Sequence, residues 1–455
     1  MSIQSNLPLS PGSTPQVDSP ASLFLDRALR DTETTSAGFP AWVAEFQRSG
    51  AESFRRIGFP STKIEDWRFT NVSKIAKSTF SRPSAPSRSS ECDRAVAGAA
   101  FDDIPIRIVF VDGFFVGALS DVSCCPVGVR ITTLSGGVDP DMRDLRNSLG
   151  ALANAQSAPF VALNQASFAD LLSVTIADGI QVSQPIQVVY VSTGQESSTL
   201  VAPRAHWQIG DNASVCIVES HFGLLDANYL TIPVCEIDLG EGAVVTHFKR
   251  QKDSTRAFHI ASTWVRQALS SRYSSGFFGF GAEICRNEIN VLHAGQFVDT
   301  VLNGLYMASG TQVLDCRTCI DHAYPNCTSH ELYKGILEGA SRGVFNGRIH
   351  VHQDAQKTDA KQSNQVLLLS DDAVIDTKPE LEIYADDVRC THGATVGDLD
   401  ADALFYLRSR GVPADLARKL LVFAFANEIV QGIAVPSLKT SLESVLLADH
   451  GLPSI

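Results

Sequence analysis

The pattern of hydrophobic and polar positions changes character twice along the chain. In residues 21–57, apolar side chains recur at helical spacing, with Trp42, Phe46 and Phe54 in one stripe, and Gly58 ends the run. From about residue 104 to about residue 396, short β-branched runs alternate with Gly, Asn, Asp and Ser. Helical spacing returns near the C-terminus. The pattern predicts a mainly β protein with α-helical segments at both ends.

This change of pattern divides the chain into four parts. Residues 1–20 are rich in Ser and Pro and are predicted to be a disordered tail. Residues 21–104 form an N-terminal helical region, with a Ser/Pro/Arg-rich linker at 81–90. Residues 105–397 form the β core, in which we expect a single helix at 158–172. Residues 398–455 form a C-terminal helical region, with helices at 398–407 and 414–433.

A weak internal repeat indicates how the β core is built. Gly210 and Gly240 stand at equivalent places in two similar segments, and Gly310 and Gly339 form a second such pair. The members of each pair are separated by about 30 residues, a period that is typical of stacked coils. A β-solenoid is therefore predicted. A sandwich or barrel of similar strand content is the competing fold.

Composition and charge narrow the partners. The net charge is −13 and no long basic run offsets it, which argues against nucleic acid and anionic membrane surfaces. No apolar run reaches membrane-spanning length and the N-terminus lacks a secretory layout, so a cytoplasmic location is expected, with the ten cysteines as thiols. Neither a P-loop nor a Gly-x-Gly-x-x-Gly motif after a strand is present, so any ATP would be bound by another chain.

Cys390 and His392 are the strongest candidate site. They lie two residues apart on a predicted strand, so their side chains point to the same face. Cysteine thiolate and imidazole are good ligands for iron and for iron–sulfur clusters. Two ligands do not complete a coordination shell, so the others would come from elsewhere in the chain or from a second subunit.

Two further groups offer metal ligands. Five thiol or imidazole side chains lie close together in the sequence: Cys316, Cys319, His322, Cys327 and His330. Their spacing resembles that of a zinc-binding structural protein, but residues three apart on a strand face opposite ways, which argues against such a site. His350 and His352 share one face of a strand, and we interpret them as exposed strand residues or neighbours in the stack.

Enzymes on a β-helix are the alternative class. A carbohydrate-active hydrolase or lyase needs paired carboxylates, and Asp386 and Asp387 are the only tempting pair, although adjacent strand residues face opposite ways. Residues 339–343 match Gly-x-Ser-x-Gly around Ser341, yet a strand follows, where a nucleophile elbow needs a helix. A turn between two coils is the preferred interpretation.

Several segments, in order along the chain, resemble the SufB/SufD family of the Suf iron–sulfur cluster assembly machinery. Seven lie in the last third of the chain: residues 347–349, 354–360, 364–370, 376–379, 382–388, 390–397 and 405–411. An eighth, Lys63-Ile64-Glu65-Asp66-Trp67-Arg68-Phe69-Thr70, resembles the family's N-terminal motif. The Cys390-Thr391-His392-Gly393-Ala394-Thr395 sequence is similar to the SufD branch, because SufB typically has Glu-His-Glu-Ala-Thr there.

The resemblance implies a fold, partners and a role. The fold would be a right-handed parallel β-helix in a complex of one SufB, one SufD and two copies of the ATPase SufC. The edge at 390–396 would pair with SufB, and a homodimer is the other possible state of the isolated chain. His392 would be a metal ligand shared with SufB, with Cys390 second, in iron acquisition and transient assembly of a nascent cluster. The chain would be a non-enzymatic scaffold with no cofactor in isolation.

The resemblance also implies a docking surface for SufC on the C-terminal helical pair, residues 400–433. The side chains expected to form it are Phe405, Tyr406, Leu416, Leu420, Phe423 and Asn427. The second helix is apolar on several sides, which is typical of a helix that fills a core or meets a partner.

Overall fold

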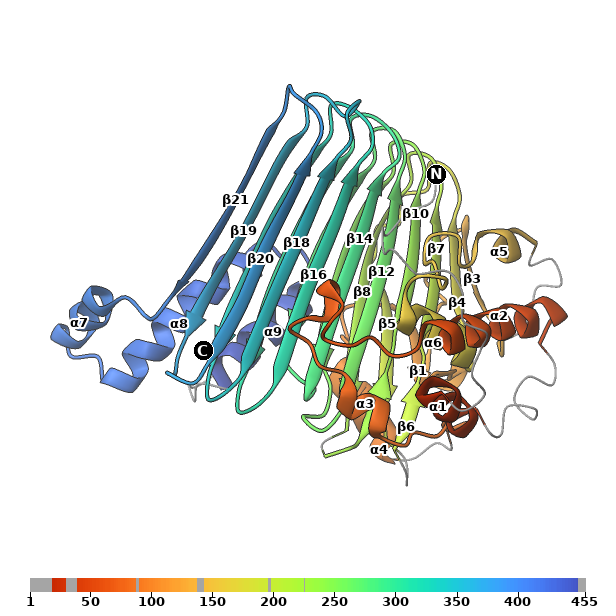
Figure 1. Cartoon of the computed structure of the whole chain (residues 1–455), viewed down its shortest axis with the longest axis horizontal. Coiled ribbons are helices and arrows are strands. Elements are labelled where there is room, and N and C mark those ends of the chain that lie inside the picture. The colour runs from red at the N-terminus through yellow and green to blue at the C-terminus, as the bar shows by residue number, and fades with distance from the viewer. Residues whose placement is uncertain are drawn as a thin grey trace.

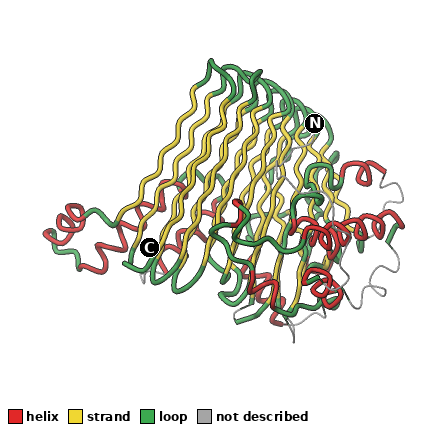
Figure 2. The backbone as a smooth tube through the Cα atoms, viewed as in Figure 1, coloured by secondary structure: helices red, strands yellow, loops and turns green. Residues whose placement is uncertain are grey.

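The computed structural model describes residues 19–29, 39–86, 90–136, 143–194, 198–224 and 226–448. The protein is a parallel β-solenoid with helical segments near both ends of the chain, which confirms the predicted fold class (Figure 1). Figure 2 shows that the strands form one continuous stack and that the helices lie outside it. Residues 1–18 of the predicted tail lie outside the described residues.

Two sheets make the walls of the solenoid. Sheet A contains, among the described residues, eleven strands: β20 (Val374–Ile383), β18 (Arg342–Val351), β16 (Val313–His322), β14 (Ile284–His293), β12 (Phe258–Gln267), β10 (Val234–Leu239), β7 (Arg204–Ile209), β4 (Leu172–Ile176) and β3 (Val129–Thr133), with β6 (Thr199–Val201) and β9 (Tyr229–Thr231) beside them. Sheet B contains, in the same part of the chain, ten strands: β2 (Phe114–Phe115), β1 (Ile106–Val111), β5 (Ile186–Ser192), β8 (Ser214–Gly223), β11 (Val244–Lys252), β13 (Arg272–Gly279), β15 (Asp299–Ala308), β17 (Thr328–Leu337), β19 (Asp359–Leu368) and β21 (Arg389–Gly397).

The strand register reproduces the sequence repeat. Leu239 lies beside Ile209, and Arg342 lies beside Val313, so neighbouring strands of one sheet are offset by one repeat. Turns stack as closely as strands do. Gly339 has a φ of +69°, and a Cβ added there would lie 2.9 Å from the backbone nitrogen of Gly310 in the coil below. Glycine at the turn therefore allows adjacent coils to approach.

The N-terminal helices pack on the outer face of sheet A. They are α1 (Pro20–Ala28), α2 (Ala41–Ile57), the 3₁₀ turn η2 (Glu65–Trp67) and α3 (Ser73–Lys77). Phe54 and Trp67 share an apolar cluster with Phe258 and Trp264 of β12, whose burial anchors this layer. A short 3₁₀ turn, η3 (Gly117–Leu119), follows β2.

Three details differ from the predicted organisation. Ser81, expected in a linker, forms a parallel bridge with Thr199, and α4 (Ser90–Ala99) begins where that linker was expected to end. The Cys92 side of α4 is buried against sheet B. The helix expected at 158–172 is α6 (Pro159–Ser167), but α5 (Arg143–Ser148) also interrupts the β core. The sequence patterns missed α5 because it is short and polar.

The C-terminal helices are α7 (Ala401–Ser409), α8 (Ala414–Val430) and α9 (Pro436–Ala448). Helices α8 and α9 cover the outer face of sheet B, where Val422 and Leu438 share an apolar cluster with Phe278 and Leu305. The buried Lys334 of β17 donates to the carbonyl oxygen of Phe425 at 3.0 Å, which ties α8 to the stack. Helix α7 buries none of its residues and projects from the body (Figure 1).

The two ends of the solenoid differ. At the end formed by the first strands, β2 and β3 pair antiparallel with their neighbours and terminate the two sheets. At the other end, β20 terminates sheet A and β21 terminates sheet B, both in the parallel register of the coils. No described strand continues either sheet beyond them. We call this second end the open end.

Candidate functional site

Cys390 and His392 lie on the inner face of β21, at the open end. Cys390 is in register with Ala360 of β19, and His392 is in register with Gln362. Ala360 and Gln362 are both buried in the solenoid interior, 0 % and 3 % exposed, whereas the intervening Lys361 is exposed. Side chains alternate along a strand, so the two β21 residues point the same way as their buried neighbours. This agrees with the shared face expected from their spacing.

The interior below His392 is polar. Gln362 donates from Nε2 to Oε2 of Glu331, which is in register with it one coil further down, at 2.7 Å. Thr318 reaches the same oxygen from sheet A at 3.0 Å. Glu331, Gln362 and His392 therefore form a column of polar side chains that begins in the buried interior and ends at the open end.

The protonation state of Cys390 separates the two candidate ligands. Partial burial raises the pKa of the Cys390 thiol above its ordinary value, and this effect outweighs a backbone hydrogen bond from Ala360 that lowers it. The thiolate is the form that binds metal, so Cys390 stays protonated at neutral pH until a cation arrives. His392 is exposed, so its imidazole is accessible to an ion or a partner chain.

Strand β21, which carries the two residues, is exposed to solvent. All described residues of β21 except Cys390 are exposed, including Val396 at 44 %. Strand β20 is only half-buried along its length. An edge strand with free N–H and C=O groups is a template for pairing with another chain.

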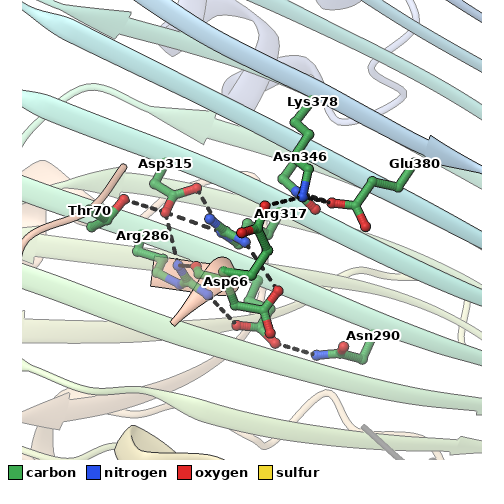
Figure 3. A network of polar contacts seen from close by, with 11 residues as sticks. Asp66, Thr70, Arg286, Asn290, Asp315, Arg317, Asn346, Lys378 and Glu380 are labelled. Carbon is green, nitrogen blue, oxygen red and sulfur yellow. Dashed lines mark hydrogen bonds and ion pairs between the residues drawn. The ribbon is translucent and has the colours of Figure 1, made fainter. Parts of the chain in front are cut away.

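The N-terminal motif at residues 63–70 lies on the outer face of sheet A (Figure 3). The buried carboxylate of Asp315 accepts hydrogen bonds from Thr70 Oγ1 at 2.5 Å and from Arg286 Nη1 at 3.0 Å. It also pairs with Arg317 Nε at 3.2 Å. Arg286 Nη1 donates to the carbonyl oxygen of Asp66 at 2.7 Å, which fixes the motif to β14 and β16.

The same motif reaches the last strand of sheet A. Lys378 of β20 pairs with Glu65 at 2.5 Å and with Glu380 at 2.6 Å. Asn346 of β18 donates to Glu380 at 3.0 Å, so the network spans adjacent coils (Figure 3). These contacts tie the open end to the N-terminal region through the outer face, while Cys390 and His392 stay on the inner face.

The proposed zinc ligands are not brought together. Cys316 faces the apolar interior, and Cys319 points to the opposite face of the same strand, as its spacing indicates. Cys327 is buried and donates to the carbonyl oxygen of Gly295 at 3.3 Å. His322 is bonded to Ser329 at 2.8 Å, while His330 is half exposed on the outside.

The enzyme candidates also lack an assembled site. Ser341 lies in the turn between β17 and β18 and donates to the carbonyl oxygen of Ala308 at 3.1 Å, as expected for a turn between coils. Asp386 and Asp387 lie in a bend between β20 and β21, so their assignment to a strand was wrong. Asp387 is paired with Lys357 of the preceding coil. This ion pair between coils gives Asp387 a structural role that does not require catalysis.

The predicted docking residues divide into two sets. Phe405 and Tyr406 of α7 are 73 % and 58 % exposed, and Leu420 of α8 is 39 % exposed. Leu416, Phe423 and Asn427 are half-buried, and Phe423 packs against the cluster beneath α8. The residues of α8 that do face the core are Ala417, Val422, Ala426, Ile429 and Val430.

One contact was missed by reading the sequence. His350 and His352 both approach Asp321, which lies one coil earlier and in register with His350. The interpretation of the two histidines as exposed strand residues or neighbours in the stack is therefore incomplete, because it names no carboxylate partner. The signal was a carboxylate one full repeat before His350 in the sequence, and not one close to it.

The fold and the inner-face residues define a β-solenoid that is terminated at one end and open at the other. A profile described as "SUF system FeS cluster assembly, SufBD core domain" matches residues 190–425, and one described as "SufBD protein N-terminal region" matches residues 29–188. The chain belongs to the SufBD family of iron–sulfur cluster assembly proteins.

Individual relatives agree over most of their length. The SufBD family protein slr0076 of Synechocystis is 32 % identical over 429 residues, 91 % of this chain and 93 % of the relative. SufD of Escherichia coli is 31 % identical over 386 residues, covering 84 % of this chain and 88 % of the relative. The chloroplastic protein ABCI7 of Arabidopsis thaliana is 30 % identical over 419 residues, covering 90 % and 87 %.

Within the residues that the structure describes, every helix is too short or too polar to cross a lipid bilayer.

Proposed function

We propose that this chain is a scaffold subunit of iron–sulfur cluster assembly that joins a SufB-type chain through its open end. The observation that carries the proposal is the position of His392, which is exposed on the inner face of a terminal strand whose outer edge is unpaired. A second solenoid added in the same direction would pair with β20 and β21 and cover His392. A heterodimer with SufB is the proposed state, and a homodimer is the alternative for the isolated chain.

The same arrangement supports a shared metal site. His392 supplies one imidazole, and Cys390 supplies a thiol whose raised pKa favours metal binding only when a cation displaces the proton. Beneath them, Glu331 is buried and lies two strands away from His392 along the stack, and its Oε2 is bonded to Gln362 and Thr318. The remaining ligands of iron or a nascent cluster would therefore come from the partner, and iron acquisition would occur at the joint.

The C-terminal helices are proposed to dock an ATPase of the SufC type. Helix α7 presents Phe405 and Tyr406 to solvent, and buried apolar contacts hold α8 and α9 against sheet B. Exposed aromatic side chains on a projecting helix suit a protein interface. Because α8 rests on the sheet that ends in β21, movement of a docked ATPase would reach the open end. ATP would be bound by the partner, and this chain would act as a scaffold.

The experiment compares His392→Ala with wild type in the complete complex. Cluster formation is followed by visible absorption under anaerobic conditions, and complex assembly by size-exclusion chromatography. We expect His392→Ala to assemble normally and to form little or no cluster. His330→Ala, which removes a half-exposed histidine from the outer face of β17, is the matched control and should form cluster like the wild type. Cluster yield from His392→Ala equal to that of the control would refute the role of His392.

Location and the enzyme alternative remain testable in the same preparation. A cytoplasmic location stays a prediction. Purification from native cell extract should return this chain with an ABC-type ATPase. Recovery as a lone chain with activity on a polysaccharide would favour the β-helix hydrolase or lyase.

A further inference from the structure

Asp321, His350 and His352 bring three metal-ligating atoms together on the outer face of sheet A. Asp321 Oδ1 lies 3.0 Å from His350 Nδ1 and 2.7 Å from His352 Nε2. The three atoms all lie within 4.8 Å of one another. Among the residues that the structure describes, this is the group of three or more His, Cys, Asp or Glu side chains that could hold an ion.

We propose that these three residues form a binding site for a divalent first-row transition-metal ion. Two imidazoles and one carboxylate on one side of an ion, with other positions open, are the ligand set of Fe(II) sites. The choice of iron over zinc or cobalt rests on the proposed function, whereas the existence of the site does not. The site is separate from His392, which lies on the inner face of another strand.

The two N–O separations are close to those of ligands that share an ion. Ligand atoms about 2.1 Å from a metal and at right angles to each other are about 3.0 Å apart. The two observed N–O separations, 3.0 and 2.7 Å, are close to that value. Coordination requires the ring protons to lie on the other nitrogens, Nε2 of His350 and Nδ1 of His352, and the carboxylate already carries the negative charge that a cation needs.

The fold holds two of the ligands in place. Asp321 and His350 are register partners on β16 and β18, so their backbones are fixed by the ladder between coils. His352 follows β18 directly, and its backbone N–H donates to the carbonyl oxygen of His322 at 3.0 Å. The His350 and His352 rings lie 4.3 Å apart, measured between centroids. A site on strand ends is more precise than one built on a free loop.

The ion site is accessible to solvent and has open coordination positions. The side chains of Asp321, His350 and His352 are 17 %, 25 % and 44 % exposed, so an ion can enter from solvent. Glu382, the neighbour of His350 in the next coil, is paired with Arg348 at 3.0 Å and is not one of the three grouped ligands. Water or an incoming ligand would therefore fill the open positions.

The place of the site in the fold suggests its use. Strand β20 ends at Ile383, and residues 384–388 turn the corner into β21, where Cys390 is the second residue. Ile349, Val351 and Ala385 form the small apolar cluster against which Cys390 packs. Ile349 and Val351 flank His350 along the chain, so this apolar cluster links the strand of the ion site to Cys390. An ion held here would be stored at the corner next to the proposed joint.

The test titrates the isolated full-length chain with Co(II), whose visible absorption reports histidine coordination, and then with Fe(II) under anaerobic conditions. We expect one equivalent to bind to the wild type. Asp321→Asn, His350→Gln and His352→Gln should each weaken binding by more than the roughly 10- to 100-fold that losing an outer-shell partner costs. Circular dichroism checks that the variants keep their fold, and three separate variants guard against the loss of any one.

Two controls locate the ion. His330→Gln removes a histidine that also lies near a carboxylate, with Asp359 3.8 Å away, and should leave binding unchanged. His392→Gln should also leave it unchanged. The proposal is overturned if the wild type gives no Co(II) spectrum or if Asp321→Asn binds as tightly as the wild type. Loss of binding in His392→Gln would also overturn it, by placing the ion at the open end, and would leave the proposed function standing.

Discussion

Glu331 should make the stability of the solenoid depend on pH. Its side chain is buried, and its Oε2 accepts hydrogen bonds from Gln362 at 2.7 Å and Thr318 at 3.0 Å, while no partner is found for Oε1. Burial raises the pKa of Glu331 to about 7, because the ionised form loses its hydration and the two hydrogen bonds compensate only in part. The carboxyl is thus largely neutral just below neutral pH.

The direction of the effect follows from the protons bound. Between the usual pKa of 4.5 and the folded value of about 7, the folded chain binds more protons than the unfolded chain. Its free energy of unfolding therefore falls as the pH rises through this window. The difference between 4.5 and about 7 corresponds to about 3 kcal/mol, at 1.36 kcal/mol for each pKa unit. This contribution is present in full below pH 4.5 and is lost by about pH 8.

The perturbation is Glu331→Gln, which keeps the shape of the side chain and removes its charge. Its amide oxygen can accept the same two hydrogen bonds. We expect the variant to exceed the wild type in free energy of unfolding by about 3 kcal/mol at pH 8 and by under about 1 kcal/mol at pH 5. Urea denaturation followed by circular dichroism at the two pH values measures the difference, and other titrating groups cancel between the two chains.

The matched control is Glu338→Gln, on the turn that follows the same strand, where the carboxylate is exposed. It should change stability little at either pH. A Glu331→Gln chain with no gain at pH 8 would refute the reasoning. So would a gain of the same size at pH 5, because either result would mean that the folded protein stabilises the charged carboxylate.

Two further predictions concern the outer faces. Asp315→Asn should cost about 3–5 kcal/mol in urea denaturation, because it leaves two buried guanidinium groups without their shared carboxylate. Asp238→Asn, which breaks an exposed pair with Arg266, should cost under about 1 kcal/mol, and similar losses for both would contradict the network in Figure 3. Phe405→Asp should weaken recovery of the ATPase in a pull-down, whereas Val127→Asp, at a 96 % exposed site on another part of the chain, should not. Equal recovery with both variants would count against α7 as the docking helix.

Helix α8 shows that helical spacing alone does not identify the side of a helix that meets a partner. The family resemblance implied a docking surface that includes Leu416, Leu420, Phe423 and Asn427, but Phe423 packs against the cluster beneath α8. The helix is apolar on several sides, so spacing alone does not tell which side meets sheet B. A charge at Phe423 would disturb this packing as well as any docking, which makes Phe405 the cleaner probe.

The strands and their stacking were predictable because they follow local rules. Glycines that recur once per coil mark turns that must stack, and the shared face of Cys390 and His392 follows from strand alternation. The open end was not predictable from the sequence pattern, because β21 contains the same types of residue as strands in the middle of the solenoid. The contact of Asp321 with His350 was missed because the two residues are neighbours only between adjacent coils. In the sequence they are one full repeat apart.

The difference between the two ends of the solenoid limits how the molecule can associate. If both ends were open and parallel, each chain could accept another at either end, and head-to-tail addition would continue into a fibre. Here β2 and β3 end the sheets in antiparallel pairs, whereas β20 and β21 end them in the parallel register of the coils. A partner that continues the parallel coils is therefore matched at one end of the chain and mismatched at the other. This difference favours a pair over a fibre.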